Sequence, residues 1–119
     1  MIDSNKMVDE LLCVLEDKGI RVFYQYPEDF ETLPSVSYYN LITTEGFRAD
    51  NAEQAQLSHV QVDIWAKKRT QPGKIAAMVN EIMQNAGWIR ELSRDLPKET
   101  EHHVYHHTMR FAKEVYLGG

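Results

Sequence analysis

The chain has 119 residues, with 13 Lys and Arg against 18 Asp and Glu, so its formal net charge is −5 with the five histidines neutral. Its 43% hydrophobic and 26% charged residues match ordinary globular proteins, which excludes wholesale disorder and fibrous repeats. A chain of this length folds around one core, so we expect residues 1–119 to form a single domain, which excludes a multi-domain enzyme. The acidic balance disfavours DNA or RNA as a conventional partner, because phosphate binding draws on clustered Lys and Arg.

A helix over residues 3–18 is the first predicted element. Its apolar residues recur with helical spacing and form one stripe: Val8, Leu11, Leu12 and Leu15. Asp3 or Ser4 is placed to cap its start, and Gly19 to end it. The single cysteine, Cys13, falls within this helix, so we expect a buried, inert thiol and neither an intramolecular disulfide nor a cysteine-based zinc site. A reducing compartment is the expected environment.

Two strands are predicted after this helix. The first spans residues 20–26 and is stopped by Pro27, which cannot donate to a ladder. A polar connection leads to the second strand, over residues 36–42. Alternation with a period of two places its apolar side chains on one face: Val36, Tyr38 and Ile42.

Residues 43–57 break this alternation, and Phe47 and Leu57 are the only bulky apolar side chains in the run. We expect a long loop or a protruding hairpin tip that serves assembly, so that shortening it between residues 45 and 52 preserves folding. An aromatic residue beside a cation is a combination enriched at protein interfaces. The predicted contact residues of this segment are Glu45, Phe47, Arg48 and Asp50.

Residues 59–66 alternate most cleanly and predict a strand whose inward residues are Val60, Val62, Ile64 and Ala66. Trp65 falls on the polar face, where it either packs under another element or marks a contact surface. The basic run that follows, Lys67, Lys68 and Arg69, either ends the strand in water or touches an acidic neighbour. Trp65 and these three cations complete the set of predicted protein-contact residues.

A second helix and two further strands are predicted in the C-terminal half. Pro72 starts the helix with Thr70 as its cap, and Gly87 ends it. The strands are expected over residues 88–96 and 103–117. The order helix, three strands, helix, two strands predicts an α+β fold, with one antiparallel or mixed sheet of about five strands and both helices packed on it.

The predicted core draws on both helices and the sheet, through Leu11, Leu12, Val62, Ile64, Ile82 and Phe111. Truncating Ile64 or Leu12 to alanine should cost about 2–5 kcal/mol. Truncating Lys67 or Gln56 should be nearly silent by comparison.

Four histidines cluster near the C-terminus: His102, His103, His106 and His107. On a helix, partners four residues apart could grip one metal, but on the predicted strand the same separation is ~13 Å, too far for two ligands of one ion. We therefore expect no metal and no cofactor, and histidines that face solvent or a neighbouring subunit. Protonating all five histidines of the chain would cancel its charge of −5, so association should increase as the pH falls.

Charged residues interrupt the N-terminal stretch at Asp3, Lys6 and Asp9, so we expect no signal peptide. No window approaches the ~20 consecutive apolar residues that span a bilayer. The expectation is a cytoplasmic protein without a membrane partner.

The order of these patterns resembles the small tail-completion proteins of long-tailed bacteriophages and prophages, a group that includes tail terminators and tail-to-head joining proteins. The resemblance covers roughly residues 5–117 and rests on spacing and alternation rather than on a catalytic signature. It is carried by Val22 to Pro27, Leu33, Pro34, Val36 to Tyr39, the strand ending in Ile64, Trp65 and Ala66, the helix closing at Gly87, and Trp88 followed by a long strand through Met109, Arg110 and Phe111.

The resemblance implies a non-enzymatic structural protein whose copies assemble into a ring, commonly a hexamer. Such a ring caps the tail tube and meets the head-connector proteins, while DNA passes through it without specific binding. The family has no catalytic residues to carry over to this sequence. The implied location is the host cytoplasm during assembly and then the virion tail or neck.

Two other functions stay open at this point. A small bacterial enzyme or ligand-binding domain could use the histidine-rich strand with Glu99 and Glu101. A regulatory adaptor could bind one protein partner through Trp65 and the segment 43–57. The assembly state of the protein distinguishes both of these functions from the ring-forming function that the resemblance implies.

Overall fold

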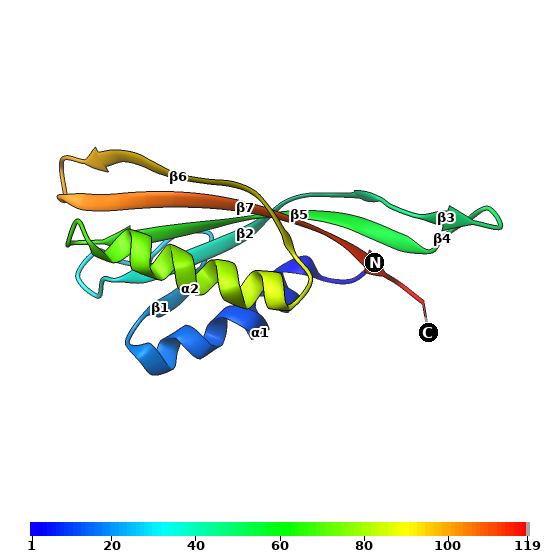
Figure 1. Ribbon diagram of the computed structural model, residues 1–119, viewed down its shortest axis with the longest axis horizontal. Helices are drawn as coiled ribbons and strands as arrows, with labels where there is room; N and C mark the ends of the chain where they lie inside the picture. Colours follow the sequence, from blue (N-terminus) through cyan, green and yellow to red (C-terminus); the bar gives the residue numbers. More distant parts are fainter. Residues whose placement is uncertain (119) are drawn as a thin grey trace.

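The elements follow one another along the chain as Figure 1 shows, in the computed structural model that describes residues 1–118. The helices are α1 (Ser4–Leu12), the 3-10 helix η1 (Cys13–Lys18) and α2 (Gln71–Asn85). The strands are β1 (Arg21–Tyr24), β2 (Ser35–Glu45), β3 (Arg48–Ala49), β4 (Ala52–Glu53), β5 (Ala55–Ala66), β6 (Ile89–Glu99) and β7 (Val104–Tyr116).

Five of the strands form one mixed sheet in the order β1-β2-β5-β7-β6. β1 runs parallel to β2, and the other neighbouring pairs are antiparallel. Both helices lie on the same side of this sheet (Figure 1), and β3 and β4 form a separate small hairpin. The predicted α+β fold, with two helices packed on a five-stranded sheet, is confirmed.

The core lies between the two helices and the sheet face that they cover. Side chains of a strand alternate between faces, so the even-numbered residues of β5 point into this core. Of the predicted core residues, four are fully buried and two are partly buried against them: Leu12, Val62, Ile64 and Phe111 in the first group, Leu11 and Ile82 in the second.

The start of α1 is capped by Asp3, whose Oδ1 accepts the backbone N–H groups of Asn5 and Lys6 at 3.0 and 3.2 Å. The α-helix continues directly into the 3-10 helix η1. This helix ends at Gly19, which has a φ of 78° that glycine adopts without strain. Cys13 is exposed, so the predicted buried thiol is wrong. It is the first residue of the tighter winding and lies off the buried stripe of α1.

α2 begins as predicted, with Pro72 in its first turn. Thr70 occupies the cap position but makes no capping hydrogen bond through its side chain; instead, Gln71 Oε1 accepts the Lys68 backbone N–H at 3.3 Å. In the described part of the chain, neither α1 nor α2 is long and apolar enough to cross a membrane.

Residues 43–57, called the arm below, form a hairpin that projects beyond both helices (Figure 1). β2 continues to Glu45, β3 and β4 pair at the tip, and β5 already starts at Ala55. The tip residues Asp50 and Asn51 have φ values of 52° and 59°, as the central residues of a type I′ hairpin turn do. Of the two predicted possibilities, a long loop or a protruding hairpin tip, the structure contains the hairpin.

The break in alternation along this segment has two structural causes. The ladder between β2 and β5 shifts register between Asn40 and Ile42. Gly46 then lets the two strands approach closely, because a Cβ atom at that position would lie 3.2 Å from the Ala55 carbonyl oxygen.

Gln56 is fully buried at the root of the arm, which contradicts the surface position assumed for it in the sequence analysis. Its Nε2 donates to the Ile2 carbonyl at 2.9 Å and to Ser58 Oγ at 3.0 Å, and its Oε1 accepts the Ile2 N–H at 2.8 Å. The side chain thus ties the N-terminal segment to β5. Its even number places it on the helix-facing side of the strand, where a polar residue needs internal partners.

Candidate protein-interaction site

The tip of the arm is an acidic, projecting surface. The arm contains three carboxylates and one cation, namely Glu45, Asp50 and Glu53 and the guanidinium of Arg48. The Arg48 guanidinium donates to the Glu45 carboxylate and to the Asn51 carbonyl, the latter at 2.7 Å, and the residue faces Glu53 across the hairpin. Arg48 is therefore held within the tip, which keeps an excess of negative charge.

Large apolar side chains are exposed on and beside the arm. The Phe47 residue is 54% exposed, although its backbone N–H is fixed to Glu114 Oε1 at 3.0 Å. Ile42 on β2 and Tyr116 on β7 are also more than half exposed. A projecting hairpin that displays aromatic and aliphatic side chains is suited to contact with another protein.

The eight predicted contact residues fall into two groups at opposite ends of the molecule (Figure 1). Four lie on the arm: Glu45, Phe47, Arg48 and Asp50. The other four, Trp65, Lys67, Lys68 and Arg69, lie where β5 ends and α2 begins. The three cations are exposed, and Lys67 Nζ donates to the His102 carbonyl at 2.8 Å.

Trp65 is packed rather than displayed, with 5% of its surface exposed. Its Nε1 donates to Ser37 Oγ at 2.9 Å. Its ring lies against His106, Tyr26 and Phe30, with ring centroids 3.8, 5.0 and 5.8 Å away. Of the two interpretations given for Trp65, packing under another element is confirmed, and the loop that carries Tyr26 and Phe30 provides the cover.

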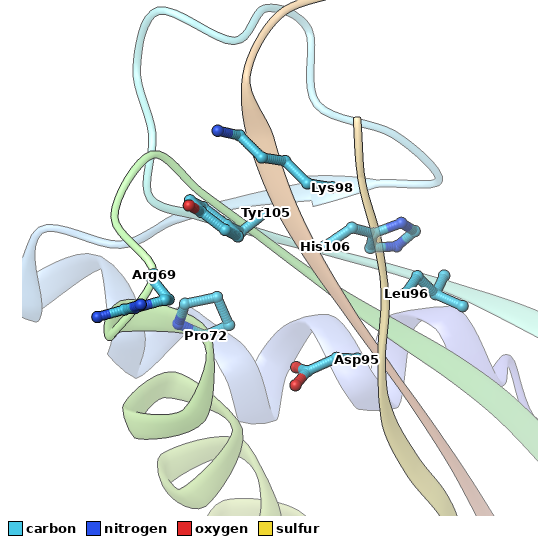
Figure 2. A pocket seen from close by; sticks show the side chains of 7 residues that line it. All are labelled: Arg69, Pro72, Asp95, Leu96, Lys98, Tyr105 and His106. Carbon is cyan, nitrogen blue, oxygen red and sulfur yellow. The ribbon is translucent and has the colours of Figure 1, made fainter. Parts of the chain in front are cut away.

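A cavity of about 260 Å³, called the basic pocket below, lies beside the start of α2. Figure 2 shows its lining, which consists of Arg69, Pro72, Asp95, Leu96, Lys98, Tyr105 and His106. Arg69 and Lys98 are exposed, and the Lys98 ammonium lies 4.8 Å from the centre of the Tyr105 ring. Pro72 is buried, and its ring and the Tyr105 ring give the pocket an apolar lining beside the two cations, whereas the Leu96 and His106 side chains point to the other side of the sheet (Figure 2).

The four clustered histidines lie in two different environments. His102 and His103 belong to the turn between β6 and β7, whereas His106 and His107 are neighbours on β7 and point to opposite faces of the sheet. The expectation that they face solvent or a neighbouring subunit is wrong for His107, which is buried. His106 is partly buried, and its Nε2 lies 2.8 Å from Asp63 Oδ1.

Ser93, His107 and Asp95 form a hydrogen-bonded relay. His107 Nε2 lies 2.8 Å from Ser93 Oγ, and His107 Nδ1 lies 2.8 Å from Asp95 Oδ1. This is the connectivity of a serine–histidine–aspartate triad. The Asp95 side chain is 84% exposed, unlike the buried carboxylate of that template. Sequence analysis missed this group because it depends on the register that places Asp95 opposite His107.

Glu99, Glu101 and His102 bring three potential metal ligand atoms within 4.8 Å of one another in the turn between β6 and β7. The Glu99 carboxylate accepts the backbone N–H groups of Glu101 at 2.8 Å and of His102 at 2.6 Å. Desolvation raises the pKa of Glu99, but these hydrogen bonds outweigh it and hold that pKa below its usual value. The three residues thereby stabilise the turn.

Comparisons of the chain with protein-family models and with curated proteins find no match. The resemblance to tail-completion proteins therefore stays a prediction. The functional argument rests on the arm, the basic pocket and the polar clusters described above.

Proposed function

We propose that this chain is a structural assembly protein of the tail-completion type. Its copies form a ring at the end of a phage or prophage tail tube and join that tube to the head connector. The proposal combines the resemblance stated in the sequence analysis with one observation, which is the arm. Residues 46–54 of this hairpin extend past the helix-covered core and contribute little to it, and Phe47 is more than half exposed, as are Ile42 on β2 and Tyr116 on β7.

The charge of the chain supports the same function. With a net charge of −5, copies gathered around a channel would repel the phosphate backbone, so DNA passes without being held. The partners in this proposal are further copies of the chain, the tail-tube protein and the head-connector proteins. The place of action is the host cytoplasm during assembly and then the virion neck.

Electron microscopy of the negatively stained protein tests this function, with an arm-shortened variant as the matched control. In that variant, residues 47–54 are replaced by Asn-Gly, which closes β2 on β5 where the Gly46 N–H donates to the Ala55 carbonyl at 2.9 Å. We expect rings from the wild-type protein and single particles from the variant. A folded wild-type protein that yields no rings, alone or with purified tail tubes, would overturn the proposal.

A second candidate function, acyl transfer, rests on the relay of Ser93, His107 and Asp95. In such a reaction Ser93 Oγ attacks the carbonyl of an ester, and its proton passes to His107 Nε2 and then to the leaving alcohol. Water then releases the acyl group from the serine. Ser93 is exposed, as a nucleophile must be, and the histidine-rich strand is the one that the enzyme hypothesis named.

Labelling with a fluorophosphonate probe, located by peptide mass spectrometry, tests this candidate. A label on Ser93 that disappears in Asp95→Asn would support acyl transfer, because the probe reports an activated serine rather than an exposed one. Ser93→Ala is the matched control. A wild-type protein labelled no more than this control would remove the candidate.

A further inference from the structure

The arm tip is acidic, and a run of cations lies at the opposite end of the molecule. The molecule measures 53 Å along its longest axis and 27 by 23 Å across, and the arm and the start of α2 lie at its opposite ends (Figure 1). The arm has the three carboxylates of Glu45, Asp50 and Glu53 against one internally bonded cation. The other end has the exposed run Lys67, Lys68 and Arg69, with Lys98 nearby across the basic pocket. Acidic residues of this end lie around Lys67, namely Glu28, Asp29 and Glu31, and in the turn after Lys98, namely Glu99 and Glu101. The positive charge is therefore local to the basic pocket.

The basic pocket has the lining that an aromatic side chain requires. Pro72 and Tyr105 supply apolar surface, and Arg69 and Lys98 lie beside it (Figure 2). The Asp95 carboxylate of the lining lies 2.8 Å from His107 and stays exposed. Within residues 1–118 neither Arg69 nor Lys98 forms an ion pair, so both cations can meet an incoming acidic group.

The arm tip offers the matching groups. Phe47 projects a half-exposed ring from a backbone fixed by Glu114, and acidic residues flank it on the same hairpin. We infer that the arm tip of one copy docks in the basic pocket of the next copy. Phe47 enters between Pro72 and Tyr105, and the tip carboxylates approach Arg69 and Lys98. This inference rests on the proposed assembly function and names the contact that would carry it.

Such a contact is head-to-tail, because the two surfaces are different and lie at opposite ends of one chain. Two arms cannot replace it, since like charges at their tips repel. A head-to-tail contact leaves a free arm and a free pocket on every short assembly, so it continues until the chain of copies closes into a ring or grows as a filament. The electrostatic attraction between the arm tip and the basic pocket should weaken as salt is added.

Sedimentation velocity of complementary variants tests the contact. The arm variant is Phe47→Ala, the pocket variant combines Arg69→Glu with Lys98→Glu, and the matched control is Lys6→Glu, an exposed cation on α1 away from both surfaces. Each of the first two should sediment as a single chain of 13.8 kDa while Lys6→Glu assembles like the wild type. An equimolar mixture of the arm and pocket variants should form dimers and nothing larger, because it retains one intact arm and one intact pocket per pair.

The failure of this contact and the failure of the proposed function give different results. If the wild type assembles and either variant assembles equally well, the contact is wrong, the tip or the pocket serves another partner, and the assembly function stands. If the mixed variants stay single while the wild type assembles, the contact is also wrong. If the wild type itself never assembles, both the contact and the proposed function are overturned.

Discussion

The imidazole of His106 lies flat against the indole of Trp65, with ring centroids 3.8 Å apart and ring planes 14° apart. The same imidazole reaches Asp63 Oδ1 through its Nε2 at 2.8 Å, and the indole N–H donates to Ser37 Oγ at 2.9 Å. Hydrogen bonds therefore fix both rings, on the sheet face that the helices leave uncovered.

Tyr38 should make the protein sensitive to alkali. Burial, together with the hydrogen bond that its hydroxyl donates to Asp9 Oδ1 at 2.8 Å, raises the pKa of Tyr38 well above its usual value. The folded protein therefore keeps a proton that the unfolded chain loses near pH ~10, so this stabilisation is complete below about pH 10 and declines as the pH rises further.

Urea unfolding from neutral pH to pH ~11 checks this expectation against Tyr38→Phe. The variant should lose about 1 kcal/mol at neutral pH, where the hydrogen bond is intact. Its stability should then fall less steeply than that of the wild type at alkaline pH. Parallel curves for the two proteins would show that Tyr38 is not the group responsible.

Ile64→Ala should lower the free energy of unfolding by about 2–5 kcal/mol, because the side chain is fully buried between the sheet and the helices. Lys68→Ala should change it by less than about 0.5 kcal/mol, since Lys68 is exposed at the end of β5. Chemical denaturation of both variants measures the difference. Equal effects would contradict the position of the core.

Gln56→Ala should destabilise the protein by about 1–3 kcal/mol, because the truncation leaves the Ile2 backbone groups and Ser58 without their buried partner. Gln84→Ala, at an exposed position of α2, is the matched control and should be nearly silent. Thermal unfolding of the two variants separates the outcomes. A silent Gln56→Ala would mean that this clamp contributes nothing to stability.

Much of the fold follows from the sequence because its signals are local. Alternation in residues 59–66 and the apolar stripes of both helices depend on neighbours within one element, and the structure contains all three elements. Gln56 shows the limit of this approach. Alternation extended backwards along β5 would place it on the inward face, but Gln56 and Ser58 are polar while Leu57 between them is apolar, so the hydrophobic pattern reverses at the start of the strand.

The polar clusters depend on contacts between residues far apart in the sequence. Asp63 meets His106 and Asp95 meets His107 only because β5 and β6 flank β7 in a particular register, which no local pattern specifies. The arm is different, since its lack of periodicity and its Phe47 next to Arg48 were visible in the sequence. Of the basic pocket, the sequence predicted only the run of cations that ends at Arg69. Lys98 and Tyr105 could not be predicted, because they reach the pocket from β6 and β7.

Light scattering of the purified protein and of its arm-shortened variant, over a range of concentrations, tests most directly the claim that the arm makes this chain an assembly protein. The wild type should rise from the single-chain mass of 13.8 kDa to a fixed multiple of it, and the variant should keep the single-chain mass with an unchanged unfolding transition. A wild type that keeps the single-chain mass at every concentration, or a variant that associates as the wild type does, would contradict the claim.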